Sequence, residues 1–234
     1  MKKRAILIAA GEATRWGNYL DTPKHFIEVD GEPIIKRSVR LLKKFGVDDI
    51  YIVAKDDTYQ IEGAKLYIPT FNLANHDADK FLNSKDLWLR DEGKTIVLYG
   101  DVYFTEYAME TIVNHPHNDW LLFARQYEST ITGGAGECFA QTFYPGQVEE
   151  HERALLKLVE YFDTGRLNRI GGWEHYRIMA GLPEPIIHKH FTGDRFVEIN
   201  DWTDDFDNPT EYETFLIKRK MLRNGKCPLC ERSQ

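Results

Sequence analysis

The feature that most constrains this 234-residue chain is its alternation of short apolar runs with helical patterns. "RAILIAA" at 4–10 is continuously apolar, as in a strand buried on both faces of a parallel sheet. "PIIKRSVRLLKKFG" at 33–46 repeats apolar residues at helical spacing and stops at a glycine. The elements expected next are strands at 48–54, 64–69 and 94–104 and a helix at 77–93. This alternation predicts an α/β fold with an open, doubly wound, mainly parallel sheet.

The second half of the chain continues the alternation less regularly. The elements expected there are strands at 119–126 and 137–144, a helix at 146–162, a turn into a short helix at 169–183, a strand at 195–201 and a helix at 209–223. No repeat or linker-like stretch divides the chain. We therefore expect one domain over residues 1–223, elaborated by an insertion at about 125–195, and a flexible tail over 224–234.

Composition excludes several classes of protein. Hydrophobic residues make up 42% of the chain, so a full core can form. No apolar run approaches the roughly 20 residues of a membrane span, and the start "MKKRAILIAAGE" turns polar too early for a signal peptide. The formal charge of -7 argues against a protein that coats nucleic acid. We expect a cytoplasmic protein that binds neither a membrane nor nucleic acid.

The cysteines agree with a reducing compartment. Their number is odd and their spacing irregular, so a disulfide framework is not expected. Cys138 stands alone, whereas Cys227 and Cys230 have the spacing of half a zinc site. The pair near the end of the chain belongs either to a frayed tail or to a zinc site completed by another chain.

The loop after the first strand carries the first functional signal. Ala9, Ala10 and Gly11 end the strand with small residues, which lets backbone N–H groups approach a ligand closely. Arg15 and Lys24 follow at a spacing that can reach an anion held there. The stretch matches neither G-x-G-x-x-G nor the P-loop, because five residues separate its glycines and no Lys-Ser/Thr follows. The pattern predicts a phosphate cradle of another kind.

The segments "LIAAGEATRWG" and "TPKHFIEVDGEPII" resemble the opening signature of the nucleotidyltransferases, GT-A-like enzymes that join a nucleoside triphosphate (NTP) to a phosphorylated sugar or other phosphorylated alcohol. The matching residues are Ala9, Ala10, Gly11, Arg15, Pro23, Lys24, Val29, Gly31 and Pro33. One departure is Ala13, where the family usually has a second glycine. The resemblance implies a GT-A-like, Rossmann-like fold with Arg15 and Lys24 as catalytic residues. It also implies nucleotide binding by Ala9, Ala10, Gly11, Glu12, Arg15 and Lys24.

A carboxylate follows the most apolar strand. Asp101 comes after Gly100, where the resemblance implies the metal-binding and catalytic aspartate of the family. Mg²⁺ is the expected cofactor, because it takes one or two carboxylates and completes its shell with water and phosphate oxygens. An ordinary turn built on Gly-Asp is the structural alternative.

A second acidic segment lies late in the chain. "DFDNPTEYE" resembles the family's closing segment and implies Asp205 and Asp207 as further metal ligands. A different register gives that role to Asn200 or Asp201. The structural alternative is an acidic loop that caps the helix beginning at Pro209.

The middle of the chain is expected to select the acceptor. Two glycine-rich turns, "TGGAGE" and "GGWEHYR", permit close approach to a ligand. Trp173 can stack on a ring and Arg177 can hold a phosphate, and we add Glu137 and Lys189 as acceptor candidates. A tryptophan in the core and an arginine on the surface are equally compatible with the pattern.

Together these features predict a Mg²⁺-dependent nucleotidyltransferase that transfers a nucleoside monophosphate from an NTP to a phosphorylated acceptor and releases pyrophosphate. The sequence leaves two alternatives. A GT-A glycosyltransferase would share the sheet and metal site but use a nucleotide sugar, and would not need Lys24. A catalytically silent nucleotide-binding module would be compatible with Ala13. Whether the chain forms a homo-oligomer is left open.

Overall fold

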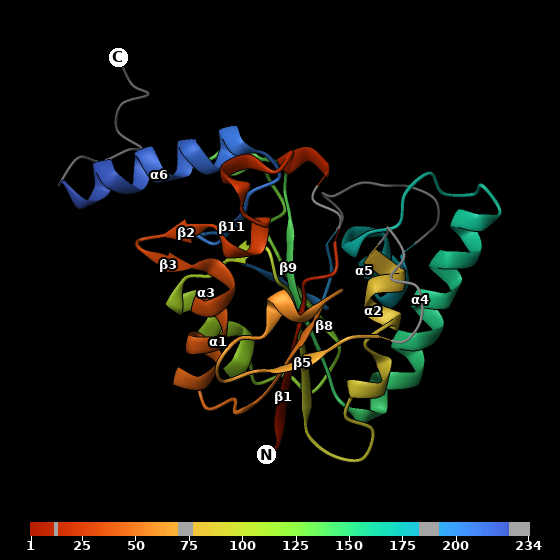
Figure 1. The fold of residues 1–234 in the computed structure, drawn as a ribbon. Helices are drawn as coiled ribbons and strands as arrows, with labels where there is room; N and C mark the ends of the chain where they lie inside the picture. The colour runs from red at the N-terminus through yellow and green to blue at the C-terminus, as the bar shows by residue number, and fades with distance from the viewer. Residues whose placement is uncertain (12–13, 70–76, 183–191, 225–234) are drawn as a thin grey trace.

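The computed structural model describes residues 1–11, 14–69, 77–182 and 192–224. At its centre is a seven-stranded sheet in the order β10-β8-β9-β6-β1-β4-β5 (Figure 1). Every neighbouring pair in this sheet is parallel except for β9, which runs antiparallel to both β6 and β8. The strands are β1 (Lys3–Ile8), β4 (Asp49–Val53), β5 (Lys65–Tyr67), β6 (Lys94–Tyr99), β8 (Leu121–Ala124), β9 (Cys138–Phe143) and β10 (Phe196–Glu198).

Helices cover both faces of the sheet, as Figure 1 shows. On one face lie α1 (Ile34–Lys44) and α3 (Glu106–Asn114), whose apolar side chains join one buried cluster with the strands. On the other lie α2 (Asp77–Leu82), α4 (Val148–Asp163) and α5 (Gly172–Met179), around a second cluster. The predicted doubly wound α/β fold with a mainly parallel sheet is therefore confirmed.

A third apolar cluster lies above the carboxyl ends of the strands. It joins the opening loop and the hairpin β2 (Glu28–Val29) and β3 (Glu32–Pro33) to α6 (Pro209–Arg223). Trp16 packs edge-on against Tyr212, at 5.9 Å between ring centroids. A short antiparallel pair, β7 (Val102–Tyr103) with β11 (Asp204–Asp205), lies in the same layer. Segments from both ends of the chain therefore cover the edge of the sheet where a ligand is expected.

Short 3-10 turns occupy the opening loop and several connections. They span Thr14–Trp16, Tyr19–Asp21, Lys24–Phe26, Asp57–Tyr59, Lys85–Leu87 and Pro145–Gln147. The turn at Lys24–Phe26 follows Pro23, whose φ of -57° suits the entry to a helical turn. The chain thus presents Lys24 from a fixed backbone rather than from an extended loop.

The helix predicted at 77–93 is wrong in its length, because α2 ends at Leu82. Ser84 donates its hydroxyl to the Phe81 carbonyl, and the Trp88 indole N–H donates to the same hydroxyl. These contacts satisfy groups at the helix end and turn the chain into the 3-10 turn at Lys85–Leu87. The helix α3 was not predicted; it begins after Thr105, whose hydroxyl accepts from the Ala108 N–H.

The strand predicted at 94–104 is divided by Gly100 and Asp101 into β6 and β7. A Cβ atom at Gly100 would lie 2.8 Å from the Ile8 carbonyl oxygen, so this position requires the absence of a side chain. The break turns Asp101 out of the main sheet at its carboxyl edge.

The segment at about 125–195 is built into the same sheet. It contributes β9 between β6 and β8, and its helices α4 and α5 cover one face. Among the described residues, no helix is long and apolar enough to cross a membrane.

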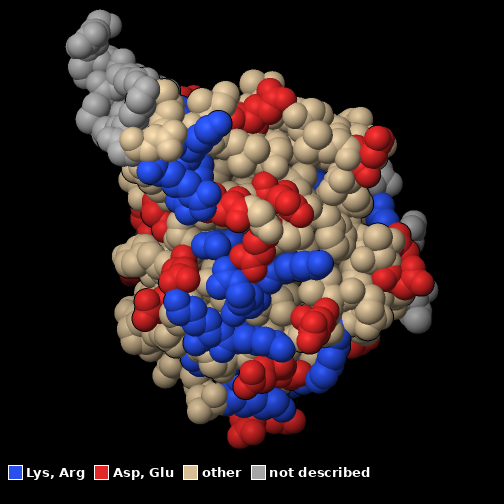
Figure 2. Space-filling model, turned by 60° about the vertical axis from the view of Figure 1, so that its left-hand side comes forward, with Lys and Arg blue, Asp and Glu red and all other residues tan. Residues whose placement is uncertain are grey.

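The face formed by α1, α3, the β2–β3 hairpin and α6 carries basic side chains among acidic ones (Figure 2). Several of them are paired there, such as Arg40 with Glu32 at 2.7 Å and Lys44 with Glu106 at 2.6 Å. Carboxylates thus lie between the basic side chains on this face and pair with several of them.

Candidate active site

The opening loop leaves the sheet at its centre. Ala9 and Ala10 are each 2% exposed, and the Ala9 N–H donates to the Val53 carbonyl, which extends the β1 ladder by one residue. Gly11 follows at the carboxyl edge. Strand ends at the middle of an open α/β sheet form the crevice where such folds bind ligands. Glu12, predicted to bind nucleotide, lies outside the described residues.

Lys24 is the centre of the charged cluster. Its side chain is 7% exposed, and its Nζ donates to Asp101 Oδ2 at 3.0 Å. The same Nζ lies 3.7 Å from Asp207 Oδ1 and 3.9 Å from Asp205 Oδ2. The structure therefore brings together Lys24, Asp101 and the pair Asp205 and Asp207, which the sequence analysis selected from three separate segments.

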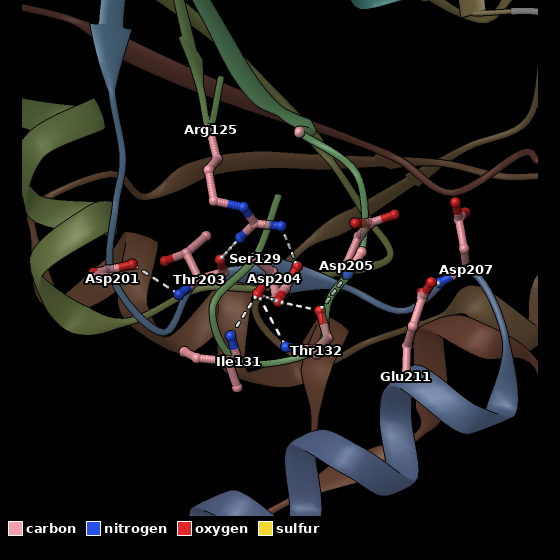
Figure 3. A network of polar contacts seen from close by, with 12 residues as sticks. Arg125, Ser129, Ile131, Thr132, Asp201, Thr203, Asp204, Asp205, Asp207 and Glu211 are labelled. Carbon is pink, nitrogen blue, oxygen red and sulfur yellow. Dashed lines mark hydrogen bonds and ion pairs between the residues drawn. The ribbon is translucent and has the colours of Figure 1, made fainter. Parts of the chain in front are cut away.

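The pairing of β7 with β11 brings the late acidic segment to Asp101. Asp205 pairs with Val102, the residue directly after Asp101. Farther along, the Asp207 N–H donates to the Glu211 carboxylate in the first turn of α6 (Figure 3). The Asn208 side chain caps that helix. The backbone on each side of the cluster is thus fixed by hydrogen bonds.

The second register considered for this segment leads elsewhere. Asn200 is exposed. Asp201 accepts hydrogen bonds from the Thr105 hydroxyl and from the Thr203 N–H at 2.7 Å. These contacts give Asp201 a structural role beside the start of α3, whereas Asp205 and Asp207 are the residues that face Lys24.

Arg15 lies at the solvent side of the cluster. Its guanidinium reaches both oxygens of Asp207 at 2.7 Å, and its side chain is 71% exposed. A planar fork of this kind binds carboxylate and phosphate oxygens equally well. Arg15 is therefore available to an anionic ligand that enters from solvent.

Burial and charge set the protonation of the cluster. Burial alone would lower the pKa of Lys24, but the three carboxylates outweigh it and raise that pKa above its usual value. Burial alone would raise the pKa of Asp101, yet the nearby ammonium lowers it to about 2. The pKa of Asp205 is raised well above its usual value by burial and by Glu137, Asp207 and Asp101. Burial and like charges thus favour the protonated form of Asp205, whereas the ammonium keeps Asp101 ionised.

A buried pair supports Lys24 from behind. His25 is 4% exposed, and its Nδ1 is hydrogen bonded to the Tyr59 hydroxyl at 2.9 Å. Burial lowers the pKa of His25 to about 4; the charge of Asp101 opposes this, whereas Lys24 and Lys80 add to it. His25 is thus neutral at physiological pH and leaves Lys24 as the cation of this turn.

Three of the predicted acceptor residues, Glu137, Trp173 and Arg177, are described by the structure. Glu137 is half-buried and close enough to Asp205 to raise its pKa. Trp173 is 4% exposed; its indole N–H donates to the Gly136 carbonyl, and its ring stacks on Phe196. Arg177 is buried on α5, with 8% exposure.

Other residues singled out in the sequence are not described by the structure. Lys189, Cys227 and Cys230 lie outside the described residues. Cys138 is buried at the start of β9. A Cβ atom at Gly172 would lie 2.7 Å from its sulfur, so Cys138 packs tightly against α5.

One cation near the loop was missed in the sequence. A Cβ atom on Gly11 would lie 3.5 Å from the Nζ of Lys80, which comes from α2. Lys80 also contributes to the low pKa of His25. Its sequence neighbourhood, "DADKFLN", reads as an ordinary solvated helix face, so no local signal marks it.

The donor set fits a magnesium ion that shares its shell with substrate. Within the described parts of the chain, no group of three or more His, Cys, Asp or Glu is arranged to hold a metal ion by itself. Mg²⁺ does not require such a cage, because one or two carboxylates suffice when phosphates and water complete the octahedron. The carboxylate oxygens of Asp101, Asp205 and Asp207, which converge on Lys24, agree with that mode of binding.

A family model described as the MobA-like NTP transferase domain matches residues 5–126, more than half of the chain. The chain belongs to the MobA-like NTP transferase family. It is a nucleotidyltransferase, as the opening signature indicated. The matched region includes the loop with Arg15, the turn with Lys24 and the break at Asp101, and it ends before Asp205 and Asp207.

Solved structures share this fold over nearly the whole chain. The CTP:phosphocholine cytidylyltransferase of Streptococcus pneumoniae is 15% identical, has a TM-score of 0.56, and is matched over 93% of this chain and 99% of its own. A putative glucose-1-phosphate thymidylyltransferase of Bacillus anthracis is 13% identical with a TM-score of 0.61, over 92% and 94% of the two chains. The inositol-1-phosphate CTP transferase of T. maritima is 16% identical with a TM-score of 0.56, over 93% and 96%. A comparison with curated protein sequences found no match.

Proposed function

We propose that this MobA-like NTP transferase transfers a nucleoside monophosphate from an NTP to a phosphorylated sugar or small alcohol, with Mg²⁺ as cofactor and pyrophosphate as product. The observation that carries the proposal is the position of Lys24 among three carboxylates at the carboxyl edge of the sheet. The names of the structural neighbours support the acceptor class, because phosphocholine, glucose-1-phosphate and inositol-1-phosphate are all phosphorylated alcohols. Because NTPs are cytoplasmic metabolites, we propose that the protein acts in the cytoplasm.

The reaction needs an in-line displacement at the α-phosphorus. A phosphate oxygen of the acceptor forms a bond to the α-phosphorus while the bond to the bridging oxygen of pyrophosphate breaks, and that oxygen keeps the electron pair. The protein contributes little covalent chemistry to such a step, so positioning and neutralisation of charge dominate catalysis.

The residues of this chain divide that work. The backbone at Ala9, Ala10 and Gly11 takes the nucleoside side of the NTP, where small side chains allow close approach. Arg15 exchanges its exposed carboxylate partner for phosphate oxygens. Lys24 donates to the departing pyrophosphate from a buried position, where a charge has more effect than in water.

Asp101, Asp205 and Asp207 would hold the metal ion. A divalent cation held by these carboxylates would neutralise charge on the phosphates during the displacement. Because Lys24 contacts the same carboxylates, a metal ion held there would share them with its ammonium.

The test is pyrophosphate release with Mg²⁺ and each NTP in turn, against a panel of sugar phosphates and phosphorylated small alcohols. We expect release that depends on one NTP and on an acceptor. Turnover of nucleotide sugars without pyrophosphate would instead favour a GT-A glycosyltransferase. NTP binding without turnover on any acceptor would favour a silent nucleotide-binding module.

A further inference from the structure

A buried ion pair lies directly behind the charged cluster. Arg125, the first residue after β8, is 3% exposed, and Asp204 in β11 is 1% exposed. The guanidinium donates from Nη2 to Asp204 Oδ1 at 2.6 Å and from Nη1 to the Thr203 carbonyl at 2.9 Å. The Arg125 side chain therefore binds both the carboxylate of Asp204 and the backbone of Thr203.

The loop after β8 folds around the other oxygen of Asp204. Asp204 Oδ2 accepts from the Ser129 hydroxyl at 2.6 Å and from the Thr132 hydroxyl at 2.9 Å (Figure 3). The Ser129 oxygen in turn accepts from the N–H groups of Ile131 and Thr132. Three donors thus satisfy a carboxylate that has almost no access to solvent.

Arg125 also closes the base of this loop. Its backbone N–H donates to the Glu137 carbonyl at 2.8 Å, where the chain enters β9. Glu137 is half-buried and is one of the acidic residues around Asp205. The backbone of Arg125 therefore holds Glu137. Its side chain holds Asp204, the residue directly before Asp205.

Asp204 and Asp205 face opposite sides of the short strand β11. Successive residues of a strand alternate in direction. Asp204 points to Arg125 at 2.6 Å, whereas Asp205 lies 3.9 Å from Lys24. A displacement of Asp204 would therefore be transmitted to Asp205 through one peptide bond.

Replacing a buried ion pair by apolar residues often leaves the stability of a protein unchanged or increases it. A contribution to stability alone therefore does not explain why Arg125 and Asp204 are paired in the core. We propose that Arg125 and Asp204 are positioning residues that hold Asp205 and Asp207 at the geometry required for the metal ion. This inference rests on the proposed function, because it assigns the ion to those carboxylates.

The test measures Mn²⁺ binding to the folded protein by titration calorimetry, together with kcat and the thermal midpoint. Mn²⁺ is the probe because it shares the oxygen-ligand preference of Mg²⁺. The variants are Asp204→Asn, Arg125→Lys and the milder Ser129→Ala, which keeps the ion pair. The matched control is Lys94→Met, since Lys94 is equally buried but donates to carbonyls at the end of α3, at the amino end of β6.

For Asp204→Asn we expect Mn²⁺ affinity and kcat to fall about 10- to 100-fold at temperatures where the variant is folded, as for other residues that orient metal ligands. Arg125→Lys should show a smaller loss than Asp204→Asn, because an ammonium at this position keeps one donor to the carboxylate. Ser129→Ala should lose about fivefold, which corresponds to one hydrogen bond. Lys94→Met should lower only the thermal midpoint.

Two results would overturn the inference, and they differ. If the parental protein binds Mn²⁺ and the folded variants, Ser129→Ala included, bind it equally well, Arg125 and Asp204 are structural only and the proposed function stands. If the parental protein binds no Mn²⁺ at millimolar concentration and releases no pyrophosphate, the proposed function fails and the inference fails with it.

Discussion

The guanidinium of Arg15 and the carboxylate of Asp207, which are 192 residues apart in the chain, form a two-point ion pair with both N–O distances at 2.7 Å. The arginine side chain is 71% exposed and the aspartate 25%. Exposed pairs contribute about 0 to 1 kcal/mol to stability, because water screens them and ordering two side chains costs entropy. Arg15 can therefore leave Asp207 for a phosphate at little cost to the fold.

We expect Arg15→Ala to raise the KM for NTP about tenfold, as the loss of one charge-assisted contact of about 1.4 kcal/mol requires. The thermal midpoint should change little, since the pair is exposed. Steady-state kinetics and thermal unfolding check this. An unchanged KM together with a large fall in the midpoint would show that Arg15 acts only in folding.

Lys24→Met is expected to lower kcat about 10²- to 10³-fold, roughly 3 to 4 kcal/mol, because a buried donor aimed at developing charge acts mainly in the transition state. Lys24→Arg should recover only part, since a planar fork does not fit the place of a compact ammonium. The control is Lys36→Met on the exposed side of α1. Parental turnover by Lys24→Met would remove Lys24 from the mechanism.

Asp101→Asn and Asp207→Asn should each abolish measurable pyrophosphate release and weaken Mn²⁺ binding while leaving the protein folded. Each change removes a negative charge from the set that faces Lys24. Asn200→Ala is the matched control, because Asn200 is exposed. Inactivity of Asn200→Ala combined with activity of Asp207→Asn would favour the second register of the acidic segment.

Lys80→Met tests the cation that the structure adds beside Gly11. If Lys80 contacts the nucleotide phosphates, its removal should raise the KM for NTP about tenfold with a smaller change in kcat. Lys85→Met is a suitable control, since Lys85 pairs with Glu152 at 3.1 Å on the outer surface. Equal KM values for the two variants would assign Lys80 to the fold alone.

Two buried histidines predict a pH dependence of stability. Burial and the neighbouring His175 hold the pKa of His151 well below its usual value, and burial lowers the pKa of His175 to about 3. As pH falls below about 6.5, the unfolded chain binds protons that the folded state refuses, so each histidine lowers the free energy of unfolding by about 1.4 kcal/mol per pH unit.

Denaturant unfolding at about pH 7.5, 6 and 5 measures this slope. His175→Phe should have a smaller loss of stability on acidification than the parental protein, because a phenyl ring cannot take up a proton while the aromatic contacts with Phe81 and Trp120 can persist. Identical slopes would show that the His175 ring is protonated in the folded state.

The sequence was most informative for elements whose structure follows from their own residue pattern. The continuous apolar runs around Ile6 and Val97 are sufficient to predict buried parallel strands, and the ends of such strands indicate where Gly11 and Asp101 lie. The family signature suggested Lys24, Asp205 and Asp207 for the same site, with Lys24 at the nucleotide and the aspartates at the metal ion. Their direct contact was not predicted, because no local rule joins residues so far apart.

Other features depend on packing that no local pattern encodes. Lys80 reaches Gly11 because its neighbour Phe81 is buried against Tyr99, which orients α2. The pairing of Arg125 with Asp204 requires the end of β8 and the strand β11, 79 residues apart in the chain, to come together. In a sequence these residues read as a surface lysine, a strand-end arginine and one aspartate among many.

The cluster that joins Trp16 to Tyr212 and Phe215 also limits when the opening loop can pack during synthesis of the chain. At about 5 to 20 residues per second, a ribosome adds the last of these residues about 10 to 40 s after the first. During that interval the strands of the sheet can pair as they emerge, but Trp16 has no partner among the closing residues. The buried strands can therefore pack before α6 closes over the opening loop, and a chain that ends before residue 209 lacks that closing helix.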